Sequence, residues 1–189
     1  MKKMKMQIIE WRQFLEKGFS HNGKLSSMTV GVFDGVHIGH QELLKRIVSH
    51  NADKTPVVIT FKDNHKIESG HILTFEQKLD IFESLGVQIT IVIDFTKEVK
   101  QMSGIDFLKI LLERGNVGFF AVGSDFKCGH QQDTDAEAIQ KFFADHNIPA
   151  EIVPKVTEGS APVSSSRIRA AISAGDIDLA QKMLGRKYP

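Results

Sequence analysis

Short apolar segments alternate with longer amphipathic segments along most of the chain. A nearly continuous apolar run predicts a central parallel strand, because helices cover both faces of such a strand. The strands expected on this basis span residues 28–33, 56–61, 88–94, 117–122 and 150–153.

The amphipathic segments predict helices, since apolar residues three and four positions apart share one helix face. Thr74 and Gln77 have the spacing of a capping box, and Ser103 is the expected N-cap of the following helix. The polar segment 62–71 is expected to form a loop. The expected helices span residues 41–50, 74–85, 103–113, 135–146, 167–174 and 176–184.

Strands that alternate with helices of this length predict right-handed βαβ crossovers. The expected fold is therefore α/β, with a doubly wound parallel sheet. The 189 residues suffice for one such domain with a sizeable core, and neither a linker nor a repeat divides the chain. We expect a single domain over residues 1–189.

Charge and cysteine content narrow the class of protein. The 24 basic and 23 acidic residues leave a net charge of +1, too small to attract nucleic acid or a membrane surface. The single cysteine, Cys128, excludes an internal disulfide and fits a reducing compartment. The sequence contains neither an apolar run near the ~20 residues of a membrane span nor a signal-peptide core. We expect a cytoplasmic protein without nucleic-acid or membrane partners.

The main functional signal is a glycine-rich turn that carries His37 and His40 between the first predicted strand and the helix after it. Gly35 and Gly39 allow close approach of a ligand to the backbone. Free N–H groups at a helix start attract phosphate, and two imidazoles there can donate further hydrogen bonds. A zinc pair is the alternative, but neither a second cysteine nor clustered carboxylates accompany these histidines. The pattern favours a phosphate undergoing chemistry.

A second anion site is predicted where three serines precede a helix with two arginines in its first turn, Ser164-Ser165-Ser166-Arg167-Ile168-Arg169. A bound anion would offset the cost of placing arginine at a helix N-terminus. The alternative is a serine cap followed by solvated arginines.

The loop of residues 123–129 follows a strand on the ligand side of the predicted sheet. Phe126 can stack on a planar ring, and Asp125 can accept a hydrogen bond from a ring N–H or bind a metal. An ordinary turn with a core phenylalanine is the alternative. Residues 60–65 form a similar polar segment after a strand, and Cys128 is expected to be inert.

Three separated blocks carry a resemblance to a known family: residues 31–41, residues 122–126, and residues 163–169 with their continuation to Tyr188. Together they resemble the FMN adenylyltransferase module of bacterial FAD synthetase, which has the Rossmann-like fold of the nucleotidylyltransferase superfamily. The resemblance covers residues 29–188. It implies the reaction ATP + FMN → FAD + diphosphate, with Mg²⁺ on the phosphates.

The resemblance also implies roles for individual residues, while the metal ligands stay open. His37, His40 and Arg167 would be catalytic. The flavin would be held by Asn64, His65, Asp125 and Phe126. The residues expected to bind ATP are Gly31, Phe33, Asp34, Gly35, His37, His40, Ser165, Ser166 and Arg167.

The chain departs from the family pattern in several places, including Ser124 and Cys128, where the family commonly has a larger residue and an aromatic one. The family's Thr-Phe-x-Pro-His-Pro segment appears here without proline, at residues 60–65. Family members usually continue into a riboflavin kinase domain, which we do not expect in this chain, so a separate riboflavin kinase is a candidate partner. Two alternatives stay open: a related nucleotidylyltransferase with another phosphorylated acceptor, and a non-catalytic nucleotide- or flavin-binding protein.

Overall fold

The computed structural model describes residues 5–19, 21, 23–62 and 70–188. The described residues form a six-stranded sheet in the order β1-β4-β3-β2-β5-β8, with every neighbouring pair parallel. The chain order reverses beside β2, so the expected doubly wound α/β sheet is confirmed. The strands are β1 (Gln7–Glu10), β2 (Leu25–Val30), β3 (Lys54–Phe61), β4 (Ile89–Ile93), β5 (Val117–Gly123) and β8 (Ala150–Val153).

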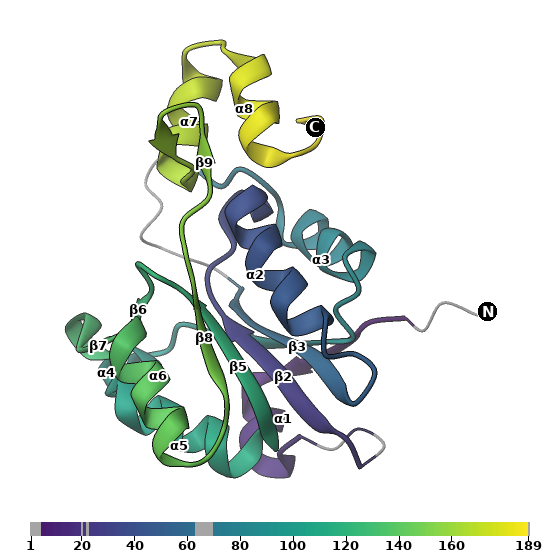
Figure 1. Cartoon of the computed structure of the whole chain (residues 1–189), viewed down its shortest axis with the longest axis vertical. Coiled ribbons are helices and arrows are strands. Elements are labelled where there is room, and N and C mark those ends of the chain that lie inside the picture. The colour runs from purple at the N-terminus through teal and green to yellow at the C-terminus, as the bar shows by residue number, and fades with distance from the viewer. Residues whose placement is uncertain (1–4, 20, 22, 63–69, 189) are drawn as a thin grey trace.

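Helices cover both faces of the sheet (Figure 1). One face packs against α2 (Ile38–Val48) and α3 (Phe75–Ser84), and the other against α1 (Trp11–Lys17), α5 (Gly104–Arg114) and α6 (Ala136–Asp145). A C-terminal pair lies beyond one end of the sheet: α7 (Ser165–Ser173) and α8 (Ile177–Leu184). The smaller elements are η1 (Asp34–Val36), α4 (Lys97–Gln101), β6 (Lys127–Cys128), η2 (His130–Gln132), β7 (Thr134–Asp135), β9 (Thr157–Glu158) and β10 (Ala161–Pro162).

The central strand β3 shows why its sequence is apolar throughout. Val58 packs into the core on the α2 and α3 side, whereas Val57 and Ile59 pack into the core on the α1, α5 and α6 side. Successive side chains of a strand point to opposite faces, so a strand covered on both faces needs apolar residues at every position.

Several local predictions are confirmed. Thr74 and Gln77 form the capping box of α3, and Ser103 caps α5 by accepting a hydrogen bond from the Asp106 N–H. Several boundaries were wrong. The first predicted strand ends at Val30 rather than at Phe33, whose backbone is left-handed with φ 54°. The helices predicted from residues 41 and 167 begin earlier, at Ile38 in α2 and at Ser165 in α7, because the turns before them are shorter than their polar composition indicated.

The sequence pattern missed the edge of the sheet. The strand β1 has four residues and runs directly into α1, so neither element has the length that marks a strand or a helix by periodicity. Pairing of β1 with β4 decides its conformation. The two-residue strands β6, β7, β9 and β10 were also missed, since hairpins of this size carry no periodicity.

In the described part of the chain the longest helices, α2 and α5, have 11 residues each. A bilayer span needs ~20 residues. Accordingly, none of the helices there is long and apolar enough to cross a membrane.

Candidate active site

The turn between β2 and α2 has an unusual backbone. Phe33, Gly35 and Val36 have positive φ angles of 54°, 79° and 38°. A β-branched residue such as Val36 rarely adopts this conformation, and it persists only where the surroundings enforce it. The φ of Gly35 favours glycine, and a Cβ atom there would also lie 2.9 Å from the Ile72 side chain. The turn is therefore strained and tightly enclosed.

His37 and His40 lie together at the start of α2. His37 is the N-cap residue, and its Nδ1 accepts a hydrogen bond from the His40 backbone N–H at 3.2 Å. The two rings stack with centroids 3.5 Å apart. This geometry brings together the two histidines that the sequence singled out.

Burial disfavours the charged form of both imidazoles. Burial lowers the pKa of His37 to about 4, against an opposing effect of the Asp125 carboxylate. Burial also holds the pKa of His40 well below its usual value, and the neighbouring His37 and Lys78 act in the same direction. The positive end of the α2 dipole likewise disfavours a charged ring at this position.

One nitrogen of the His40 ring, Nδ1, is buried and has no hydrogen-bond partner among the described residues. The ring packs edge-on against Phe33, with centroids 5.2 Å apart. Buried polar atoms without a partner are few in native proteins, and a catalytic or ligand-binding role is one explanation for them.

The serine–arginine segment contacts the histidine turn, although Ser165 and Asp34 are 131 positions apart in the sequence. The Ser165 hydroxyl donates to the Asp34 carbonyl oxygen at 2.8 Å. The guanidinium of Arg169 forms an ion pair with the buried Asp34 carboxylate, which also accepts a hydrogen bond from the Ile72 N–H at 3.0 Å. Ser166 lies one turn before Arg169, with its hydroxyl 3.4 Å from the guanidinium.

Arg169 is thus placed at the site, although sequence reasoning had selected Arg167. The Arg167 guanidinium donates to the carbonyl oxygens of Ala161 and Glu158, at 2.9 and 3.0 Å, and so ties the β9–β10 hairpin to α7. Helical spacing was the missed signal. Residues three apart share a face, so Arg169 follows Ser166 while Arg167 points elsewhere.

Gly31 and Phe33 stabilise the turn through a backbone hydrogen bond and through packing. The Gly31 N–H donates to the Ile59 carbonyl oxygen at 3.1 Å, and a Cβ atom on Gly31 would lie 3.1 Å from the Phe33 ring. Phe33 is buried and packs edge-on against Phe82. In this structure both residues support the turn without lining the cavities described below.

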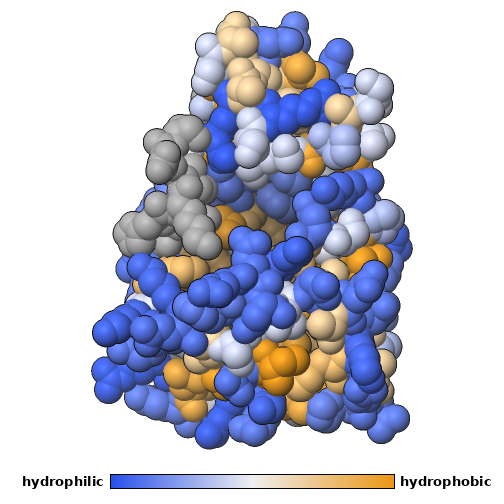
Figure 2. Space-filling model, turned by 90° about the vertical axis from the view of Figure 1, so that its left-hand side faces the viewer, coloured by the Kyte–Doolittle hydropathy of each residue, from blue (hydrophilic) through white to orange (hydrophobic). Residues whose placement is uncertain are grey.

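Three cavities surround the turn, and the molecule is hollowed on this side, between the C-terminal helices and the sheet (Figure 2). The first, of about 230 Å³, has the histidine pair and Ser165 in its wall. Asp125 lines it too and forms an ion pair with Lys155 at 3.2 Å. We call it the histidine cavity.

The second cavity, of about 490 Å³, is lined mainly by apolar and aromatic side chains, and we call it the aromatic cavity. Phe126 contributes to its wall, so the adjacent Asp125 and Phe126 belong to different cavities. Asn64 and His65, the other predicted flavin contacts, lie outside the described residues. The aromatic residues that line the aromatic cavity are Trp11, Phe61, Phe95, Phe107 and Phe126.

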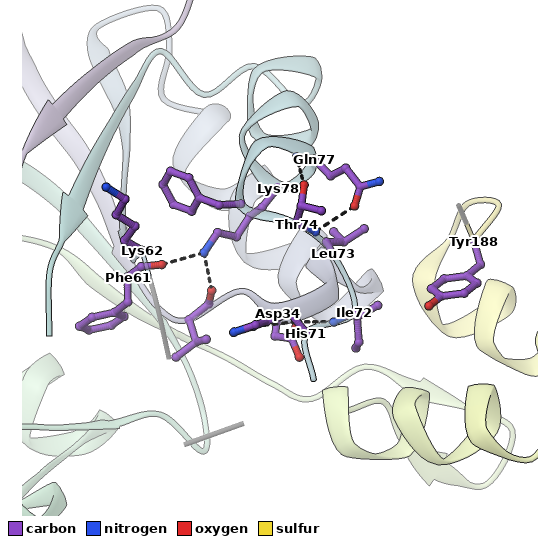
Figure 3. A pocket seen from close by; sticks show the side chains of 12 residues that line it. Asp34, Phe61, Lys62, His71, Ile72, Leu73, Thr74, Gln77, Lys78 and Tyr188 are labelled. Carbon is purple, nitrogen blue, oxygen red and sulfur yellow. Dashed lines mark hydrogen bonds and ion pairs between the residues drawn. The ribbon is translucent and has the colours of Figure 1, made fainter. Parts of the chain in front are cut away.

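The third cavity, of about 410 Å³, lies between the end of β3 and the start of α3 (Figure 3). We call it the lysine cavity, because Lys62 and Lys78 line it. Lys78 is buried, and its ammonium donates to the Phe61 carbonyl oxygen at 2.9 Å and to the Thr60 hydroxyl at 3.2 Å. Val32 and Phe61 line both this cavity and the aromatic one, so the two adjoin.

Sequence reasoning missed Lys78, since a lysine on a polar helix face is normally solvated. Burial, with the nearby Asp133, raises the pKa of the Cys128 thiol to about 12, which agrees with the expectation that this cysteine is inert. Among the described residues, no cluster of three or more His, Cys, Asp or Glu side chains is arranged to hold a metal ion.

Comparison with known proteins decides the family. A family model described as FAD synthetase matches residues 20–167. The chain belongs to the FAD synthetase family.

Several curated members of the FAD synthetase family are similar to this chain. A bifunctional riboflavin kinase/FMN adenylyltransferase of Listeria monocytogenes is 30% identical over 170 residues, which cover 85% of this chain and 54% of the relative. One of Buchnera aphidicola is 28% identical and covers 86% and 55%. A Listeria monocytogenes protein named FAD synthetase is 26% identical and covers 88% and 71%. The chain thus spans about half the length of the bifunctional relatives.

Solved structures support the fold of this FAD synthetase family member. The crystal structure of a macrolide-efflux protein from Streptococcus pneumoniae superposes with a TM-score of 0.83 at 26% identity, covering 97% of this chain and 61% of that one. A pantoate-beta-alanine ligase from Francisella tularensis superposes with a TM-score of 0.60 at 18% identity, covering 95% and 78%. The Rossmann-like nucleotidylyltransferase fold is therefore confirmed.

Proposed function

We propose that this chain transfers the adenylyl group of ATP to the phosphate of FMN, giving FAD and diphosphate. The observation that carries the proposal is the meeting of the stacked His37–His40 pair with Ser165 and Arg169 at one strained turn. Family membership supports the same reaction. A simple binding protein has no need for such a concentration of phosphate-directed groups.

The histidine cavity is the proposed ATP site. Its wall combines the N-terminal ends of α2 and α7, and such helix ends present free N–H groups to phosphate. Ser165 and His37 come from these two ends. Arg169 lies beside them, and its planar guanidinium can bind two phosphate oxygens at once. To do so, the phosphate must displace the Asp34 carboxylate from the guanidinium.

The aromatic cavity is the proposed flavin site. An isoalloxazine ring is flat and largely apolar, and pockets for such ligands combine aromatic walls with a few polar groups. Phe126 and Phe61 supply stacking surfaces. Asn64 and His65 remain predicted flavin contacts. Asp125 faces the histidine cavity, so we propose that it acts near the nucleotide.

The transfer requires little covalent work from the protein. A phosphate oxygen of FMN attacks the α-phosphorus of ATP, the new P–O bond forms, and the bond to the β-phosphate oxygen breaks. Diphosphate leaves with the electron pair. Catalysis then consists of alignment and of stabilising the charge on the transferring group. We assign the stabilisation to His40, Arg169 and the start of α2.

Arg167 stays a predicted phosphate ligand, and a direct contact requires its guanidinium to release the Ala161 and Glu158 carbonyl oxygens. We propose that Mg²⁺ binds to the protein together with the triphosphate of ATP, because protein Mg²⁺ sites commonly combine substrate phosphates with one or two carboxylates. The nearby Asp34 and Asp125 already have cationic partners, so no ligand set is assigned. A cytoplasmic location and a separate riboflavin kinase stay predictions.

The test is incubation of the purified chain with ATP, Mg²⁺ and FMN, followed by separation of FAD and measurement of diphosphate. Equal amounts of both products are expected. Release of diphosphate only with another phosphorylated acceptor would favour a related nucleotidylyltransferase. Binding of nucleotide or flavin without product would favour a non-catalytic binding protein. Lys141→Ala serves as the control variant, since this exposed side chain on α6 lines none of the three cavities.

A further inference from the structure

The C-terminal segment after α8 reaches back to the histidine turn. The Arg186 guanidinium donates to the Val36 carbonyl oxygen at 3.0 Å and also to the Gly35 carbonyl oxygen. The same guanidinium donates to the Leu184 carbonyl oxygen at 3.2 Å. One side chain therefore connects the end of α8 to two successive peptide groups of the turn, across 150 and 151 positions of sequence.

Gln41 completes this connection from the α2 side. Its Nε2 donates to the Val36 carbonyl oxygen at 2.9 Å and to the Leu184 carbonyl oxygen at 2.7 Å. Gly185 lies between the two donors with φ 67°, and a Cβ atom there would lie 2.8 Å from the Ile38 side chain. The C-terminal turn thus packs directly on the first residue of α2. We call Gln41, Leu184, Gly185 and Arg186 the clamp.

The clamp acts on the most strained part of the turn. Gly35 and Val36 both have positive φ, and Val36 is β-branched. A backbone of this kind relaxes unless neighbouring groups fix it. Hydrogen bonds from a charged donor are stronger than neutral ones, and a planar guanidinium can hold several carbonyl oxygens at once.

Arg186 lies close to the histidines without lining any of the three cavities. Burial lowers the pKa of its guanidinium, so the charge is partly desolvated. The charge also contributes, after burial and other neighbours, to the lowered pKa of both His37 and His40. Residues 20–167 carry the family match, so Arg186 lies outside it.

We propose that Arg186 is a positioning residue, which holds the turn at Gly35 and Val36 in the shape that aligns His37 and His40. This role rests on the proposed adenylyl transfer. The side chain touches neither of the proposed substrate cavities, so it acts through the backbone of the turn. Loss of the clamp lets the turn relax and moves the histidines relative to the transferring phosphate.

The kinetic test compares Arg186→Gln, Arg186→Lys and the control Lys187→Ala, which removes an exposed charge one position later. Small misplacement of catalytic groups costs up to about 10²-fold in rate, so Arg186→Gln should lower kcat by about 10- to 100-fold. The KM values for ATP and FMN should change by less than about threefold, because only His37 and His40 shift while the aromatic cavity and the other wall residues of the histidine cavity stay in place. Arg186→Lys should recover part of kcat, and Lys187→Ala should match the wild type.

A second measurement separates this proposal from the proposed reaction. NMR titration of the His37 and His40 rings should show a higher pKa for both in Arg186→Gln and an unchanged pKa in Lys187→Ala. Asp125 and Lys78, which also act on these rings, are the same in every variant. This readout stands even if the chain makes no FAD. Circular dichroism and the melting temperature establish that each variant is folded.

The proposal is overturned if folded Arg186→Gln has wild-type kcat and wild-type histidine titration. Should Arg186→Gln fail to fold, Arg186→Lys decides. An ammonium cannot span the carbonyl oxygens of Gly35, Val36 and Leu184 with the fork geometry, so wild-type kcat in that variant would also overturn the role.

Discussion

Burial of His37 predicts that acid destabilises this protein well above the pH at which most carboxyl groups titrate. In the unfolded chain a histidine has a pKa near 6.5, whereas burial lowers the pKa of His37 in the folded protein to about 4. Between these values the unfolded chain binds more protons than the folded protein does. The free energy of unfolding therefore falls as the pH drops through this window, and the loss is complete below the folded pKa.

The magnitude follows from the two pKa values. At about pH 7 both states are largely neutral and the effect is small. At about pH 5 the unfolded histidine is charged and the folded one is not, which costs about 2 kcal/mol of stability from His37 alone. His40 changes stability in the same direction, because its pKa is also lowered by burial.

The assay is urea denaturation of the wild type and of His37→Asn at about pH 7 and about pH 5. Asparagine keeps a side-chain acceptor for the His40 N–H at the N-cap position but does not titrate. The wild type should lose about 2 kcal/mol more than the variant between the two pH values. Carboxyl groups outside the site are present in both proteins, so their effect cancels in the difference.

Equal losses in the two proteins would refute the reasoning, because they would mean that His37 titrates alike in the folded and unfolded states. A larger loss in His37→Asn would contradict even the sign. Excess ATP analogue offers an independent check, since a bound anion should raise the pKa of both histidines and so reduce the loss at about pH 5.

Three further predictions concern single side chains. His40→Ala should lower turnover by about 10²-fold, the usual effect of removing one transition-state donor, with a smaller change in ATP binding measured by calorimetry; an unchanged turnover would remove His40 from the mechanism. Phe126→Ala should weaken FMN binding, measured by quenching of flavin fluorescence, and leave ATP binding intact; equal quenching would place the flavin elsewhere. Cys128 should react slowly with iodoacetamide at about pH 8, because its pKa of about 12 leaves little thiolate; rapid alkylation of the folded protein would contradict this.

Local sequence determined most of the architecture. The apolar runs of β3, β4 and β5 and the amphipathic pattern of α5 and α6 are local signals, and the structure confirms these elements within a few residues. The Thr74–Gln77 capping box is equally local, since both partners lie within one helical turn. The histidine pair was also identified from sequence, because three positions at a helix start fix their proximity.

Tertiary structure determined which of these elements contact one another. The contact of Ser165 with the turn spans 131 positions, and that of Arg186 with Gly35 spans 151. Periodicity describes the face on which a residue lies and says nothing about the element that packs there. For this reason the sequence selected Arg167 while the structure places Arg169 on Asp34.

The division of the site into cavities was likewise invisible in the sequence. Asp125 and Phe126 are neighbours in the chain but line different cavities, because their side chains point in different directions from the turn that follows β5. The strand β1 and the buried Lys78 depend on partners elsewhere in the fold, which supply the pairing and the carbonyl oxygens that stabilise them. The sequence by itself determined most of the longer elements and the phosphate-directed residues, whereas long-range packing determined the short edge elements and which of those residues meet.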